Sequence, residues 1–114
     1  MVIRKKEITA IDFCGLEIFD YTAKCNEKSS FAIIKVKPNV NHQLSRSKRS
    51  DKFYYVINGY IEFLINNDII TLNEGDFCII KKGDEFKYWN ITNETVTLVL
   101  VHTPNFILKE EVYE

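Results

Sequence analysis

The chain has 114 residues, a length that suits one domain able to bury a core without disulfide bonds or a structural metal. Its formal net charge is −1, which argues against a nucleic-acid partner and against an anionic membrane surface, because both attract an excess of positive charge. The three cysteines are widely spaced, so we expect free thiols in a cytoplasmic protein, and no apolar run approaches the roughly 18 residues of a spanning helix.

Short β-strands separated by turns are predicted along the whole chain. β-Branched and aromatic residues mark the strands, and Gly, Pro, Asn and Asp mark the turns between them. The expected strands, in chain order, are 8–13, 15–19, 31–36, 53–57, 61–65, 69–72, 77–80, 86–90 and 95–102. Strands this short, with a turn about every 8–12 residues, are typical of a β-sandwich or barrel. We therefore expect a single all-β domain over residues 1–114.

A β-hairpin lies at the centre of this pattern. The strand at 53–57 ends in Asn58-Gly59, a pair that favours tight turns, and the strand at 61–65 follows at once. The polar and basic segment from His42 to Lys52 leads into the hairpin, and we expect it to be an arm at the mouth of a barrel. The tail from Ile107 to Glu114 fits either a short helix or an edge segment.

Two segments around these turns share the spacing of a known pair of motifs. In the later segment, Gly75 is followed by five residues, Lys81-Lys82-Gly83, two residues, Phe86, three residues and Asn90. In the earlier one, Asn39 is followed by five residues, Ser45-Arg46-Ser47, four residues, Lys52, six residues and Gly59. These spacings resemble the motifs of the cupin superfamily, whose members are small double-stranded β-helix barrels. The resemblance implies a cupin jelly-roll barrel with motif regions at 39–59 and 75–90.

The resemblance also indicates where related barrels hold one divalent metal ion, and those positions differ here. The family's two His, Glu and later His are, by position, Ser45, Ser47, Lys52 and Phe86. Serine hydroxyls are poor ligands for transition metals, phenylalanine offers no ligand, and a lysine ammonium repels a cation. We therefore predict no metal and no other cofactor.

The two histidines leave an alternative open. A register shift in the arm could bring His42 to the first His position, and His102 could join it from the last strand, but this pair would make an incomplete metal site. Otherwise His42 is a loop residue, and His102 is packed in the core or lies at the rim.

Lys52 is the central residue of the predicted ligand site. Neighbours in a strand point to opposite faces, so Lys52 shares a face with Tyr54 and Val56. It could bind an anionic ligand, act as a neutral amine base, or reach the mouth with its stem packed on Tyr54. Phe86 and Tyr88 also share a face, where they fill the cavity or line it for flat or sugar-like ligands. The predicted ligand-binding residues are Ser45, Ser47, Lys52, Tyr54, Phe86 and Tyr88, and the candidates for catalysis are Lys52, Tyr54 and His102.

Three functions are compatible with these residues. The first is a metal-independent cupin domain that binds a small polar molecule, anionic or sugar-like, in the barrel. The second is a metal-independent enzyme similar to sugar epimerases and isomerases, in which Lys52, Tyr54, Tyr88 or His102 transfers a proton. The third is a structural dimerisation module with a packed barrel. We expect no nucleic-acid or membrane partner, and the family resemblance implies a homodimer paired through sheet edges.

Overall fold

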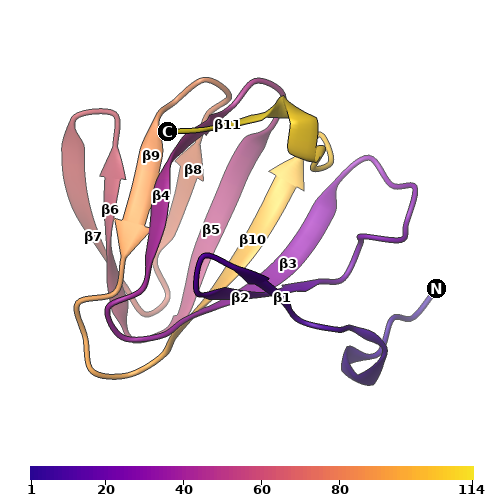
Figure 1. Ribbon diagram of the computed structural model, residues 1–114, viewed down its shortest axis with the longest axis horizontal. Helices are drawn as coiled ribbons and strands as arrows, with labels where there is room; N and C mark the ends of the chain where they lie inside the picture. Colours follow the sequence, from indigo (N-terminus) through magenta and orange to yellow (C-terminus); the bar gives the residue numbers. More distant parts are fainter.

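The computed structural model describes residues 1–114 and contains two antiparallel sheets that face each other (Figure 1). The six-stranded sheet contains, in spatial order, β1 (Ile11–Phe13), β2 (Leu16–Asp20), β3 (Ser30–Val36), β10 (Val96–Thr103), β5 (Asp51–Asn58) and β8 (Phe77–Ile80). The five-stranded sheet contains β11 (Glu111–Tyr113), β4 (Asn41–Ser47), β9 (Phe86–Trp89), β6 (Tyr60–Ile65) and β7 (Asp68–Asn73). The helical segments are two 3₁₀ turns, η1 (Lys5–Glu7) and η2 (Leu108–Glu110), and neither is long and apolar enough to span a membrane. The predicted all-β jelly roll is confirmed.

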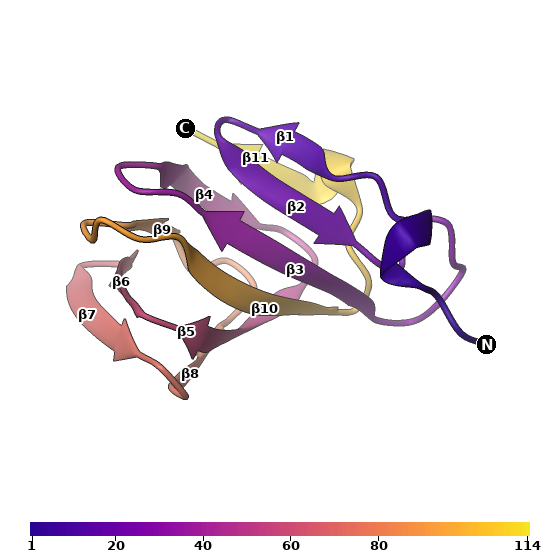
Figure 2. The same cartoon turned by 90° about the horizontal axis from the view of Figure 1, so that it is seen from below.

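The core lies between the two sheets and follows the period-two alternation of the strands. In β10, Val96, Leu98 and Leu100 are buried, while the residues between them are partly exposed on the outer face. Figure 2 shows β2, β3, β10 and β5 following one another across the six-stranded sheet, opposite β4 and β9. The aromatic side chains of Phe63 and Tyr88 complete the core from the five-stranded sheet.

The turns of the two motif regions explain why their spacing is retained. Asn39, Gly59, Gly75 and Gly83 all have positive φ, at 64°, 75°, 86° and 90°. Glycine adopts this left-handed region without strain, and asparagine is among the few other residues that tolerate it. At Gly59 a Cβ would also meet Val96 Cγ2 at 3.1 Å. The chain therefore keeps the backbone requirements of the family motifs, although the side chains at the metal-ligand positions differ.

One local prediction needs correction. The segment from His42 to Lys52 is not an arm, because β4 and the start of β5 occupy most of it and only a tight turn separates them. The strand was hard to recognise because its inward residues, His42, Ser45 and Ser47, are polar although they are buried. In the tail, one 3₁₀ turn leads into the edge strand β11, which pairs with β4, so the edge-segment alternative is confirmed.

Candidate functional site

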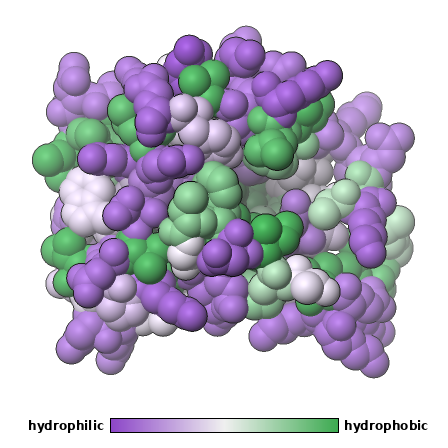
Figure 3. All heavy atoms as spheres, viewed as in Figure 1, coloured by the Kyte–Doolittle hydropathy of each residue, from purple (hydrophilic) through white to green (hydrophobic).

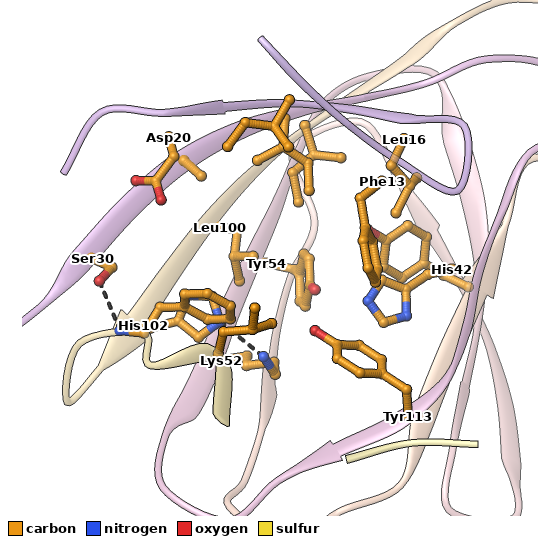
Figure 4. Close-up of a pocket in the computed structure, with 17 residues that line it drawn as sticks. Phe13, Leu16, Asp20, Ser30, His42, Lys52, Tyr54, Leu100, His102 and Tyr113 are labelled. Carbon is orange, nitrogen blue, oxygen red and sulfur yellow. Dashed lines mark hydrogen bonds between the residues drawn. The ribbon is translucent and has the colours of Figure 1, made fainter. Parts of the chain in front are cut away.

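A cavity of about 270 Å³ lies at one end of the barrel, and Figure 3 shows a hollow with apolar side chains on this face of the molecule. Its walls come from the inner faces of both sheets, from the N-terminal hairpin β1–β2 and from the C-terminal tail. Most of the lining is apolar, with Phe13, Leu100 and Phe106 among the contributors. The polar side chains in the lining are Asp20, Ser30, His42, Lys52, Tyr54, Tyr88, His102 and Tyr113, and Figure 4 labels all of them except Tyr88.

Lys52 belongs to a buried cluster of three polar side chains. Its Nζ donates to Glu111 Oε1 at 2.5 Å and lies 2.8 Å from His102 Nε2. Lys52 and His102 are directly paired across β5 and β10, while Glu111 comes from β11. The side chains of Lys52 and Glu111 are 5% and 2% exposed, so this ion pair is shielded from water.

The cluster has defined protonation preferences. Burial lowers the pKa of Lys52, and the neighbouring Glu111 carboxylate opposes that shift. Burial, together with the positive charge of Lys52, lowers the pKa of His102 to about 3. His102 is therefore neutral at pH 7, and its Nε2 accepts a hydrogen bond from the Lys52 ammonium.

His42 faces the cavity from β4. Its Nδ1 lies 2.6 Å from the carbonyl oxygen of Gln43 and must donate to it, because a carbonyl can only accept. Burial lowers the pKa of His42 to about 4, so the ring is neutral at pH 7 and Nε2 carries the free lone pair. The ring stacks on Phe86 and lies against Tyr88, with centroids 5.0 and 4.9 Å apart. These contacts hold the imidazole at the cavity wall in its neutral form, in which Nε2 can accept a proton.

Three tyrosines supply hydroxyl groups to the site. Tyr54 and Tyr88 are fully buried, and burial raises the pKa of both phenols above the ordinary value. Tyr88 Oη is itself fully buried near the Tyr54 hydroxyl, and the geometry gives it no hydrogen-bond partner in the protein. Tyr113 points its hydroxyl from the tail toward the centre of the cavity (Figure 4), and burial raises its pKa to about 12. All three are therefore protonated hydrogen-bonding groups at neutral pH.

The cavity includes some of the predicted site residues and not others. Lys52, Tyr54, Tyr88 and the catalytic candidate His102 line it together. Ser45, Ser47 and Phe86 do not. Ser47 Oγ instead accepts hydrogen bonds from the backbone N–H groups of Arg49 and Ser50 in the turn before β5. Ser45 Oγ is buried without a partner, and Phe86 packs behind His42.

A β-bulge in β4 accounts for the position of His42. The register between β4 and β9 shifts between His42 and Ser45, so both residues face inward although they are three positions apart. His42, taken above as a loop residue in one interpretation, is instead a buried strand residue of the lining. The motif spacing alone contains no sign of the bulge.

The side chains do not fit the divalent ion that the family resemblance implies. No three His, Cys, Asp or Glu side chains are grouped so that they could hold a metal ion. Of the four positions that correspond to metal ligands, two are serines, whose hydroxyls are poor ligands for transition metals, and one is Phe86. The fourth, Lys52, places a cation against Glu111. The residues at this site therefore do not suit a divalent metal ion.

The termini contribute site residues that sequence patterns did not reveal. Glu111 and Tyr113 reach the interior because they alternate with Val112 along β11. Phe13 enters from the N-terminal hairpin and packs on Tyr113, with ring centroids 5.3 Å apart. The alternation of Glu111, Val112 and Tyr113 was the only available signal, and three residues are too few to identify a strand.

Comparisons with known proteins agree with this architecture. A family model described as a cupin domain matches residues 32–102, and no curated protein matches at the significance threshold. Among solved structures, the Streptomyces nucleoside dehydratase Pac13 has a TM-score of 0.87 and 18% identity, covering 100% of this chain and 90% of that chain. Variants of Pac13 with a histidine or a tyrosine replaced were solved with uridine.

Two further solved structures have the same fold. A predicted oxalate decarboxylase from Thermotoga maritima has a TM-score of 0.81 and 22% identity, covering 91% of this chain and 99% of that chain. A sugar phosphate isomerase of the cupin superfamily from Silicibacter pomeroyi has a TM-score of 0.77 and 14% identity, covering 90% of this chain and 75% of that chain. Identities this low establish a shared fold, whereas the family match extends over more than half of the chain. The chain belongs to the cupin family.

Proposed function

We propose that the chain binds a small uncharged molecule with a ring and several oxygen atoms, such as a sugar or a nucleoside, in the barrel cavity. The observation that carries this proposal is that the polar groups of this mostly apolar cavity include no unpaired positive charge. Lys52 is paired with Glu111, His42 and His102 are neutral at pH 7, and the remaining charged group in the lining is the carboxylate of Asp20. An anionic ligand would find no unbalanced positive charge, so a neutral ligand fits better than the anionic alternative.

The walls of the cavity suit a ring. Aromatic side chains offer flat apolar surface, His42 Nε2 is free to accept a hydrogen bond, and Tyr88 Oη, buried in the wall, has no hydrogen-bond partner in the protein. The volume of about 270 Å³ limits the ligand to about the size of one nucleoside or one sugar. It also argues against a packed barrel that serves only dimerisation. Similar structures named as a nucleoside dehydratase and a sugar phosphate isomerase support this class of ligand.

Metal-independent proton transfer is the second candidate function. His42 is neutral and oriented by Gln43, so Nε2 can remove a proton from a bound ligand, and the Tyr88 hydroxyl can donate one. Pac13 supports the same residue types, because the variants solved with uridine replace a histidine or a tyrosine. We propose that neither binding nor this reaction uses a metal ion.

Uridine is a suitable first probe, and we expect it to bind in the presence of EDTA. His42→Gln and Tyr88→Phe should each weaken binding about three- to tenfold, the effect of losing one hydrogen bond in a buried site. The measurement is calorimetric titration, with glucose and xylose as sugar probes. Tyr60→Phe is the matched control, because Tyr60 lies on the outside of β6 and is 43% exposed.

Two outcomes would contradict the proposal. One is that neither uridine nor the sugars bind at millimolar concentration. The other is binding that His42→Gln and Tyr88→Phe leave as strong as in the Tyr60→Phe control, which would locate the ligand outside the cavity. Binding that requires added zinc, nickel or manganese would overturn the proposal that no metal ion is needed.

A further inference from the structure

The ammonium of Lys52 has one N–H without an acceptor. An ammonium carries three donors, and two of them are directed to Glu111 Oε1 and His102 Nε2. Lys52 Nζ makes no third hydrogen bond within the protein, since the other oxygen of the same carboxylate, Glu111 Oε2, is buried without a partner, and Lys52 lines the cavity. Its other close neighbours are apolar or aromatic: Nζ lies 5.7 Å from the ring centroid of Phe86 and 6.0 Å from that of Phe106.

The remaining N–H is fixed in direction. Because two of the three tetrahedral positions on the nitrogen are occupied, the third can turn little without breaking a buried hydrogen bond. The stem is also held, since Lys52 is 4% exposed and directly opposite His102 in the sheet. A donor that is already oriented loses less conformational entropy when a ligand binds.

We propose that this third N–H of Lys52 is a recognition site for a carbonyl oxygen, so that the preferred ligands are neutral ketones, aldehydes or cyclic amides. This inference rests on the proposed binding of uncharged molecules in the same cavity. A carboxylate or phosphate would approach the Glu111 carboxylate, which already balances the ammonium. A carbonyl oxygen accepts the N–H without adding charge, and hydrogen bonds from charged donors are roughly twice as strong as neutral ones.

Acetophenone and α-methylstyrene provide a direct test, because they share one shape and differ in whether a C=O or a C=CH₂ group is present. We expect acetophenone to bind the wild-type protein about tenfold more tightly than α-methylstyrene, the effect of one charge-assisted hydrogen bond. Bound acetophenone labelled with ¹³C at the carbonyl should also show a C=O stretch at lower wavenumber than in heptane. This infrared measurement needs no variant.

The double variant Lys52→Met/Glu111→Gln is the matched comparison, because it removes the donor without leaving a buried charge unpaired. In this variant the two probes should bind with equal affinity, and the infrared shift should disappear. A wild-type protein that binds both probes equally, or a preference that survives in the variant, would overturn the carbonyl site. If uridine and sugars fail to bind while the acetophenone preference depends on Lys52, the proposed function fails and the carbonyl site stands.

Discussion

Replacing Glu111 by alanine should lower the free energy of unfolding by about 3–5 kcal/mol, the typical cost of removing one partner from a buried ion pair. Lys52 would be left as an ammonium that is 4% exposed, with only His102 as its acceptor. The tail would also lose its ion pair with the six-stranded sheet, since Glu111 lies in β11 and Lys52 in β5. Urea unfolding followed by the fluorescence of Trp89, the one tryptophan, measures the change.

Two variants distinguish the loss of the Lys52–Glu111 ion pair from non-specific destabilisation. Lys52→Met/Glu111→Leu removes both charges, so it should recover most of the lost stability. Lys81→Ala breaks the surface ion pair with Asp51, whose Nζ–Oδ2 distance is 3.7 Å, and should change stability by less than about 1 kcal/mol. If Glu111→Ala costs no more than Lys81→Ala, the buried pair does not hold the tail in place.

The buried pair also illustrates what sequence patterns can and cannot predict. Alternation along β5 correctly placed Lys52, Tyr54 and Val56 on one inner face, because the period of a strand is two and depends only on local backbone geometry. The partner of Lys52 could not be predicted in the same way. Glu111 is 59 residues away in the sequence, and its approach depends on how the tail pairs with β4.

The turns were predictable for a related reason. Asn58-Gly59 and the glycines of the motif regions adopt left-handed backbone conformations that few other residues tolerate, so their chemistry is visible in the sequence. The strand β4 was not, because its inward residues are polar and a bulge shifts its register after His42. A hydrophobic pattern cannot identify a strand whose buried face is polar. The cavity therefore differs from prediction mainly along β4 and at the two termini.

Lowering the pH from 7 to 5 should destabilise the protein strongly, because both histidines are buried in the neutral form. Their pKa values are about 4 for His42 and about 3 for His102, against 6.5 in an unfolded chain. Below pH 6.5 the unfolded chain therefore binds protons that the native protein does not. Stability is fully present above that pH and is lost as the pH falls toward the native pKa values. With two such groups the limiting slope is about 2.7 kcal/mol per pH unit.

The surroundings of each ring determine how the two contributions can be separated. His102 is hydrogen-bonded to the Lys52 ammonium, which also contacts Glu111. His42 lies among Phe86, Tyr88 and Tyr113, where burial is the main cause of its lowered pKa and the Lys52 charge is a smaller one. His102→Gln retains an acceptor for Lys52 and should halve the slope of the free energy of unfolding against pH between pH 6 and 5. His42→Gln should halve the same slope. The chain has only two histidines, so in the double variant His42→Gln/His102→Gln the remaining pH dependence of the free energy of unfolding comes from the carboxyl groups. Urea unfolding that gives equal free energies at pH 7 and 5 would mean that both rings accept protons in the folded state, and a neutral His42 could then no longer be assigned as the base.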